Sequence, residues 1–139
     1  MKKYLGIDLG SKTIGLSISE SGIIAHSLTT YRFKENDYEA AKSMIVDVID
    51  TYQITDIVLG YPKHMNNDIG VRGKISEEMK KHIIELRDVN VVLWDERLST
   101  KSAISAMIQG KQTRSKQKQK KDELAAVLIL QNYLDYKGD

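Results

Sequence analysis

Three consecutive segments with the alternating pattern of β-strands open the chain, and they restrict its fold more than any other feature. Residues 4–9, 14–19 and 23–33 are separated by the turn-forming segments GSKT and ESG. Strands joined by turns this short pair with their neighbours in antiparallel fashion. The first part of the chain is therefore expected to form an antiparallel meander.

The rest of the chain alternates between helical and strand patterns. Apolar residues spaced three and four positions apart predict helices, and short continuous apolar runs predict buried parallel strands. The expected helices are 37–52, 71–87, one that opens at Ser99 or Thr100, and 122–136, and the expected strands are 56–60 and 90–96. This order favours a single α/β domain over residues 1–139, in which helices flank one mixed sheet of an antiparallel meander plus parallel strands.

An aspartate interrupts the first strand, in the segment YLGIDLGSKTIGLSIS. An isolated ionised carboxylate is costly to bury, so Asp8 needs hydrogen-bond donors, a cation or water. The strands 4–9, 56–60 and 90–95, if parallel, end at the same edge of the sheet, which is the edge where open α/β sheets bind ligands. We therefore expect Asp8 and the pair Asp95-Glu96 to converge there.

Each candidate carboxylate also has a structural explanation. Asp8 could accept hydrogen bonds from its own turn, and either Asp95 or Glu96 could pair with Arg97. Asp122 is expected in the first turn of the last helix, where the helix dipole favours a negative charge. Convergence favours a site instead, because two carboxylates ~4 Å apart repel each other by roughly 4 kcal/mol at an effective dielectric constant near 20.

Three carboxylates in one cluster require a divalent cation or a bound proton. Hard oxygen ligands favour Mg²⁺ or Mn²⁺, and carboxylates with open coordination positions suit the two-metal hydrolysis of phosphodiesters. The sequence alone does not decide whether Asp95 or Glu96 is the ligand.

Positive charge is concentrated in one short segment. Residues 111–121, KQTRSKQKQKK, hold six basic residues and no acidic one, although the whole chain has a net charge of only +2. This distribution indicates a local contact with a polyanion such as nucleic acid, and the alternative is a solvated loop.

Composition excludes several other classes of protein. The chain has no cysteine, which excludes disulfides and thiolate zinc sites and agrees with a reducing compartment. No segment approaches the roughly 18 consecutive apolar residues of a membrane span. We therefore expect a cytoplasmic protein with no membrane partner.

Four motifs together resemble a known family. GIDLGSKTIGLSIS, IVLGYP, VVLWDERLST and DELAAVLILQNYL are similar to segments of the YqgF/RuvX family of pre-16S rRNA nucleases, which are also called Holliday-junction-resolvase-like proteins. The similarity runs from about residue 4 to residue 135, and it implies an RNase H-like fold with a five-stranded mixed sheet. The segment GYPKHMNN departs from the family pattern, which leaves the role of the loop at 61–70 open.

The resemblance also implies a set of functional residues. The acidic triad of the family falls on Asp8, Glu96 and Asp122, which would act as catalytic residues and as ligands of a two-metal Mg²⁺ or Mn²⁺ site. The residues expected to bind nucleic acid are Lys12, Arg72, Arg97, Arg114, Lys116, Lys118, Lys120 and Lys121.

The sequence therefore predicts a metal-dependent endonuclease that processes the 5′ end of precursor 16S rRNA in ribosome biogenesis. Branched DNA and ribosomal assembly particles are further partners that the resemblance allows, and a monomer is favoured because no helix shows an extended second apolar face. Three rival hypotheses remain: a Holliday junction resolvase, a non-catalytic RNA-binding assembly module, and an ATP-binding protein of the actin and sugar-kinase kind. The last would need two lobes, and 139 residues supply one.

Overall fold

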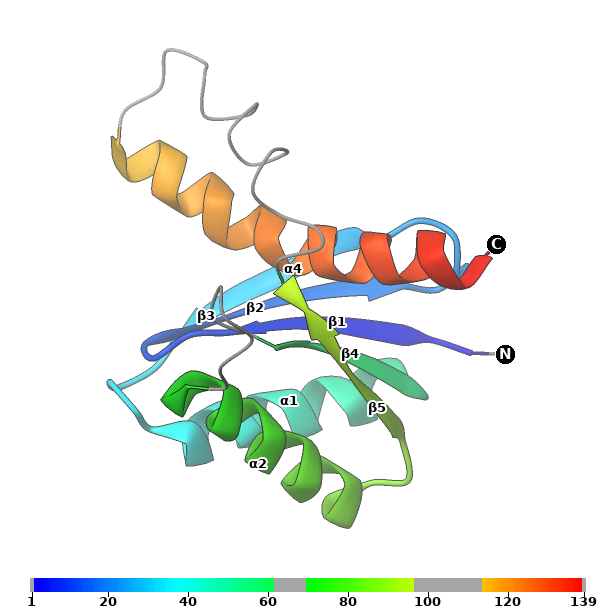
Figure 1. The fold of residues 1–139 in the computed structure, drawn as a ribbon, viewed down its shortest axis with the longest axis horizontal. Helices are drawn as coiled ribbons and strands as arrows, with labels where there is room; N and C mark the ends of the chain where they lie inside the picture. Colours follow the sequence, from blue (N-terminus) through cyan, green and yellow to red (C-terminus); the bar gives the residue numbers. More distant parts are fainter. Residues whose placement is uncertain (1, 62–69, 97–113, 139) are drawn as a thin grey trace.

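A five-stranded mixed sheet forms the centre of the molecule, with helices on both faces (Figure 1). The computed structural model describes residues 2–61, 70–96 and 114–138, and within 114–123 it describes only the backbone. The strands are β1 (Tyr4–Leu9), β2 (Thr13–Ser19), β3 (His26–Arg32), β4 (Asp56–Tyr61) and β5 (Asn90–Asp95). The helices are α1 (Tyr38–Tyr52), α2 (Val71–Leu86) and α4 (Arg114–Gly138).

The strand order is β3-β2-β1-β4-β5, with β1 at the centre. The first three strands form the expected antiparallel meander, with Gly6 opposite Ser17. β4 pairs with β1 and β5 pairs with β4 in parallel register. The predicted mixed sheet is thus confirmed, and the carboxyl ends of β1, β4 and β5 lie at the same edge.

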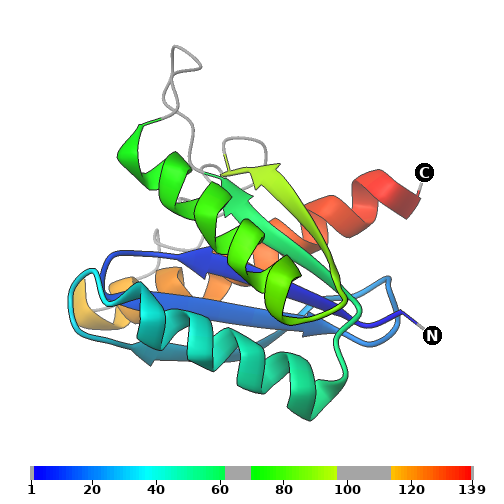
Figure 2. The same cartoon turned by 90° about the horizontal axis from the view of Figure 1, so that it is seen from below.

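The two faces of the sheet pack against different helices. α1 and α2 cover one face and α4 crosses the other, as the two views show (Figures 1 and 2). Alternate residues of β1 follow this division, because Leu5, Ile7 and Leu9 enter the core beneath α1 and α2. Tyr4 packs on the opposite face with Ile129 of α4.

A close approach between backbones fixes α4 on the sheet. The hydroxyl of Ser17 donates a buried hydrogen bond of 2.7 Å to the carbonyl oxygen of Ala126. A methyl group on Gly6 would overlap Ser17 Oγ and lie 2.7 Å from Leu130 Cβ. Glycine is therefore required at this position for the helix to reach β1.

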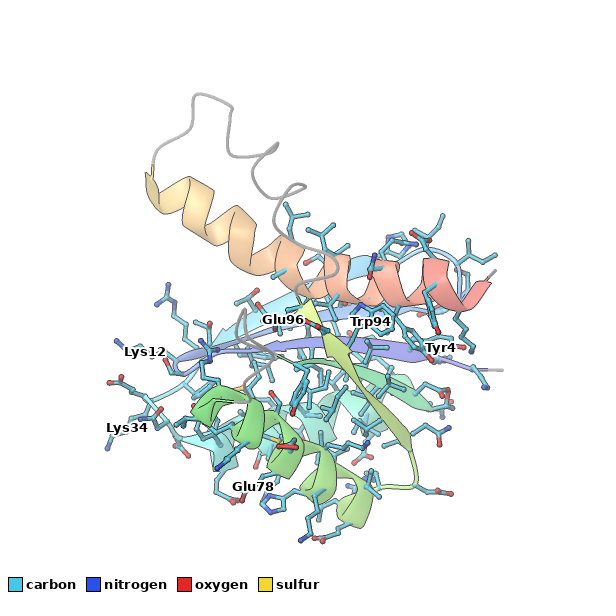
Figure 3. The ribbon with its side chains drawn as sticks, in the orientation of Figure 1. Tyr4, Lys12, Lys34, Glu78, Trp94 and Glu96 are labelled. Atoms are coloured by element: carbon cyan, nitrogen blue, oxygen red, sulfur yellow. The ribbon has the colours of Figure 1, made fainter. Side chains whose placement is uncertain are left out.

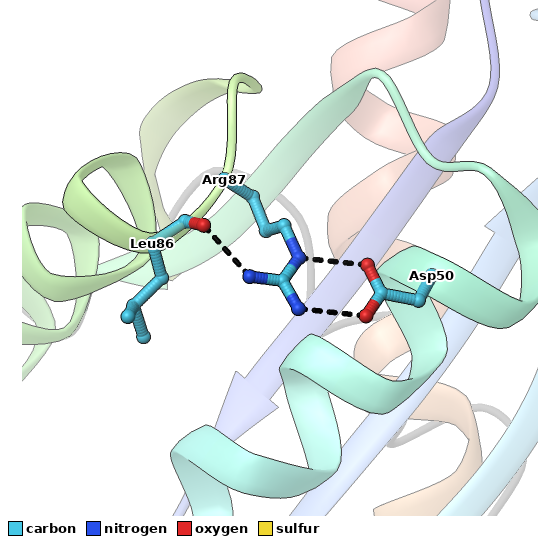
Figure 4. Close-up of polar contacts among 3 residues, drawn as sticks. All are labelled: Asp50, Leu86 and Arg87. Carbon is cyan, nitrogen blue, oxygen red and sulfur yellow. Dashed lines mark hydrogen bonds and ion pairs between the residues drawn. The ribbon is translucent and has the colours of Figure 1, made fainter.

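On the other face, a bidentate ion pair joins the ends of α1 and α2 (Figure 4). Arg87 Nε and Nη2 each donate to the Asp50 carboxylate at 2.7 Å, and Arg87 Nη1 donates to the Leu86 carbonyl oxygen at 2.8 Å. The pKa of Asp50 is lowered mainly by this hydrogen bonding. Because the pair is partly exposed, its contribution to stability is modest.

The last helix differs from the prediction, which placed its start at residue 122. α4 begins at Arg114, so most of the basic segment is helical in its backbone. Lysine, arginine and glutamine have high helix propensity even without an apolar pattern, and the sequence pattern therefore missed this extension. Asp122 consequently lies about two turns inside the helix, and the prediction that it occupies the first turn is wrong.

Two predicted features lie outside the described residues: the helix expected from Ser99 or Thr100, and most of the loop at 61–70. Among the helices that the structure does describe, none is both long enough and apolar enough to cross a membrane.

Candidate active site

Asp8 and Glu96 lie together at the carboxyl ends of β1 and β5. Asp8 occupies the face of β1 that carries Tyr4 and Gly6, which is the face covered by α4. Glu96 directly follows β5 and lies on the same side of the sheet, because its side chain borders Gly60 and Ile129. The two carboxyl groups share a hydrogen bond.

The surroundings of Glu96 favour its protonated form. Burial is the largest cause, the negative charge of Asp8 and the hydrogen bond to it come next, and together they raise the pKa of Glu96 to about 8. A proton on Glu96 can then be donated to the Asp8 carboxylate. Without a cation, the carboxyl groups of Asp8 and Glu96 therefore share one proton in a hydrogen bond.

Gly60 makes room for the Glu96 side chain. It lies on β4, between β1 and β5, and a methyl group there would overlap Glu96 Oε1 and approach Ile129 Cδ1 to 2.9 Å. The strand pattern alone did not predict this role of Gly60. A glycine inside the strand pattern IVLGYP was the available signal, because such glycines often mark a close approach.

Arg72 brings a positive charge to the site from the first turn of α2. Its Nη2 donates to the carbonyl oxygen of Leu9 at 2.8 Å, which ties the guanidinium to the end of β1. The positive charge of Arg72 lowers the pKa of Glu96 and so offsets part of the increase that burial and Asp8 cause.

Asp95 lies on the opposite face of the strand from Glu96. Asp95 shares its face of β5 with Val91 and Leu93, which enter the core beneath α1 and α2. The charge of Asp95 reaches Glu96 and contributes the smallest of the effects that raise the pKa of Glu96. The geometry therefore pairs Glu96, and not Asp95, with Asp8.

Asp122 lies one helical turn before Ala126 on α4, and its side chain is outside the described part of the structure. α4 runs antiparallel to β1, because Lys137 contacts Tyr4 whereas Ala126 lies over Gly6. The helix backbone at Asp122 is thus directed toward the end of β1 that carries Asp8. Its position inside the helix also removes the helix-dipole explanation for this aspartate.

The other predicted residues are placed differently. Lys12 is exposed in the turn after β1, and Figure 3 shows it at the outer end of the hairpin, with Glu96 further in along the sheet. Arg97 lies outside the described residues. The remaining candidates lie on the backbone of α4, and their side chains are not among the described ones: Arg114, Lys116, Lys118, Lys120 and Lys121.

The donor set suits a hard divalent cation. Asp8 and Glu96 offer carboxylate oxygens, and a cation between them would take over the role of the shared proton. The described residues alone contain no cluster of three potential ligands of the His, Cys, Asp or Glu type. A third ligand would have to come from outside them, and the side chain of Asp122 is the candidate.

Comparison with solved structures defines the fold class. The chain is similar to Thermus thermophilus RuvC in complex with a Holliday junction substrate, with a TM-score of 0.63 and 13% identity over 99% of this chain and 96% of that one. A second structure of RuvC from the same organism gives a TM-score of 0.61 and 12% identity over 98% and 96% of the two chains. The molecule therefore has an RNase H-like fold.

Comparison with families is more specific. The family model described as "RuvX: Holliday junction resolvase" matches residues 2–136. A protein of Onion yellows phytoplasma (strain OY-M) is 50% identical over 95% of this chain and 88% of its own length, and one of Staphylococcus carnosus (strain TM300) is 42% identical over 96% and 95%. Both are named "Putative pre-16S rRNA nuclease". The chain belongs to the RuvX (YqgF) family.

Proposed function

We propose that the protein is a metal-dependent endonuclease that cleaves precursor 16S rRNA near its 5′ end. The observation that carries the proposal is the hydrogen-bonded pair of Asp8 and Glu96 at the edge where three parallel strands end. The names of its relatives support precursor 16S rRNA as the substrate. The pair of carboxylates supports metal-dependent cleavage of a phosphodiester as the reaction.

In this proposal Asp8, Glu96 and Asp122 hold two Mg²⁺ or Mn²⁺ ions. Bound divalent ions activate water for attack and stabilise the charge on a departing phosphodiester oxygen. Asp8, on the central strand of the sheet, would hold the ions together with Glu96, and Asp122 would complete the set of carboxylate ligands. Gly60 supports this role of Glu96, because it leaves the carboxyl group free to lie beside Asp8.

Basic residues of the chain would hold the phosphate backbone. The guanidinium of Arg72 is anchored on Leu9 beside the carboxylates, where it can bind the phosphate that is cleaved or its neighbour. Lys12, Arg97 and the basic part of α4 would attract the flanking strand. Such contacts provide affinity and orientation without reading the sequence.

This function would place the protein in the cytoplasm, in contact with precursor rRNA and with assembling ribosomal particles. One carboxylate site per chain suits a single cut in one strand and therefore a monomer. A resolvase would instead need two sites related by a two-fold axis.

Cleavage of a junction is the second candidate, because the family model itself carries the description of a Holliday junction resolvase. The test compares labelled precursor 16S rRNA, a four-way DNA junction and a linear duplex at equal salt with Mn²⁺ or Mg²⁺. Asp8→Asn is the control. We expect metal-dependent cuts in the 5′ flank of the RNA that Asp8→Asn abolishes.

Two other outcomes would contradict the proposal. Paired symmetric nicks in the junction, with the RNA left intact, would establish the resolvase. Tight RNA binding without cleavage in either metal would establish a non-catalytic assembly module.

A further inference from the structure

Three aromatic side chains cluster where β5 meets the last turns of α4. The ring centroid of Trp94 lies 5.4 Å from that of Tyr133 in an edge-to-face arrangement, and 5.3 Å from that of Tyr136 at a tilt of 54°. Trp94 Nε1 also donates to Asn132 Oδ1 at 2.9 Å. The indole is thus held in one orientation by side chains of α4.

Packing explains only part of this cluster. Trp94 and Tyr133 are half-buried and pack against the core between the sheet and α4. Tyr136 is different, because it remains 71% exposed although its ring contacts the indole. An exposed aromatic ring that is held against a fixed indole can offer a face on which a planar group stacks.

Trp94 connects this cluster to the candidate active site. Trp94 precedes Glu96 by two residues and lies on the same face of the sheet, so the two are separated by about 6.6 Å along the strand. Figure 3 shows Trp94 next to Glu96, on the side toward Tyr4. β5 is an edge strand of the sheet, and no strand among the described residues covers its outer side.

We propose that Tyr136, supported by Trp94, stacks on an unpaired nucleobase of the bound strand, on the side of the carboxylates that faces the amino end of β1. The inference rests on the proposed function for the strand that the site binds, and it adds the class of substrate: a strand with at least one unpaired nucleotide beside the site. Every base has a π-face that stacks on an aromatic ring, but a base inside a duplex does not expose that face to the protein. Lys137 adds a positive charge at the same end of α4, where its ammonium lies 4.8 Å from the centroid of the Tyr4 ring.

The test measures binding without cleavage. A labelled single-stranded oligoadenylate RNA is titrated in EDTA and followed by fluorescence anisotropy, beside an abasic strand with the same number of phosphates and a duplex of equal length. Three variants are compared with the wild type. Tyr136→Leu keeps an apolar contact with Trp94 but removes the π-face, Tyr136→Phe keeps the ring, and Tyr31→Leu alters a partly exposed tyrosine on β3 at the other edge of the sheet.

We expect Tyr136→Leu to weaken binding of the oligoadenylate by about 5- to 100-fold and to leave binding of the abasic strand unchanged. Tyr136→Phe should restore the wild-type affinity, and Tyr31→Leu should match the wild type throughout. Trp94 is the single tryptophan of the chain, so its emission should change with the oligoadenylate and not with the abasic strand.

Equal affinity of the wild type for the base-containing and abasic strands would overturn the inference. An equal loss of affinity for both strands in Tyr136→Leu would also overturn it. Because the measurement needs neither metal nor cleavage, a failure of the proposed nuclease activity would leave the result interpretable, and a failure of stacking would leave the nuclease proposal standing.

Discussion

At the scale of single residues, the unusual property of this chain is a glutamic acid that keeps its proton near neutral pH. Burial and the adjacent Asp8 together raise the pKa of Glu96 to about 8, and the charge of Arg72 offsets only part of this effect. The pair therefore carries about one negative charge at pH 7 in the absence of metal. Such a pair is ready to exchange its proton for a cation, because the cation would relieve the same repulsion.

This pKa makes the stability of the metal-free protein depend on pH. The folded protein binds the Glu96 proton with a pKa of about 8, whereas the reference value is 4.5. The folded state therefore binds more protons between these values, so the stabilising contribution of the Glu96 proton is fully present below about pH 4.5 and is lost as the pH rises through 8. The free energy of unfolding of the wild type should fall by an amount on the order of 2 kcal/mol between pH 6 and pH 9. We expect this fall to be absent in Glu96→Gln.

Urea unfolding in EDTA across this range measures the effect. Glu35→Gln, which changes an exposed glutamate, serves as the matched control and should retain the slope of the wild type. A wild type whose stability does not change between pH 6 and pH 9 would show that the two carboxyl groups are not coupled in the folded protein.

At the scale of secondary-structure elements, β4 makes the site possible by carrying no side chain at residue 60. Gly60→Ala would place a methyl group against the Glu96 carboxyl and 2.9 Å from Ile129 Cδ1. We expect the Glu96 side chain to be displaced, with a loss of metal binding and cleavage and a cost of about 1–3 kcal/mol in stability. Calorimetric titration with Mn²⁺ and urea unfolding measure the two effects.

Gly138→Ala is the matched control, because nothing lies within 4 Å of the position of its added methyl group. It should leave both measurements unchanged. If Gly60→Ala bound Mn²⁺ as the wild type does, Glu96 would not need its present position and its role as a ligand would be refuted.

The helical extension of α4 carries the basic residues that we expect to bind phosphate. Replacing Lys116, Lys118, Lys120 and Lys121 with Gln should weaken nucleic-acid binding and leave the position of cleavage unchanged. Each lost phosphate contact lowers the slope of log affinity against log salt concentration by roughly 0.7–0.9. Binding at several salt concentrations measures the slope, and an unchanged slope would mean that this part of the helix does not contact the substrate.

The sequence predicted the helices and strands better than the residues at which they end. The alternation in 4–9 correctly predicted the strand that carries Asp8, and five strands in mixed pairing followed from the order of the patterns. The choice between Asp95 and Glu96 could not be made, because a pattern does not show where alternation ends. In the structure the alternation of β5 extends past Asp95 and puts Glu96 on the face of Asp8.

Two further features depended on tertiary contacts that a pattern does not contain. The role of Gly60 depends on a close approach between β4 and the side chain of Glu96 at the end of β5, and the two are far apart in sequence. The aromatic surface of Tyr136 likewise depends on Trp94, from a different element. The roles of Asp122 and Arg97 stay predictions.

At the scale of the whole molecule, the fold gathers groups from distant parts of the chain at one edge of the sheet. β1 supplies Asp8, the end of β5 supplies Glu96, and α2 supplies Arg72. α4 crosses the face of the sheet on which Asp8 and Glu96 lie, and it has its basic part at one end and Tyr136 at the other. This arrangement suits a strand of nucleic acid that runs along α4 and passes the carboxylates.

The central claim is that three carboxylates from β1, the end of β5 and α4 together form the site for the two cations, and calorimetric titration with Mn²⁺ tests it most directly. The wild type is compared with Asp8→Asn, Glu96→Gln and Asp122→Asn, with Asp95→Asn as the control because Asp95 lies on the opposite face of its strand. We expect each of the first three to lose Mn²⁺ affinity by more than about tenfold, and Asp95→Asn to bind nearly as the wild type does. Loss of binding in Asp95→Asn with retention in Glu96→Gln or Asp122→Asn would contradict the account.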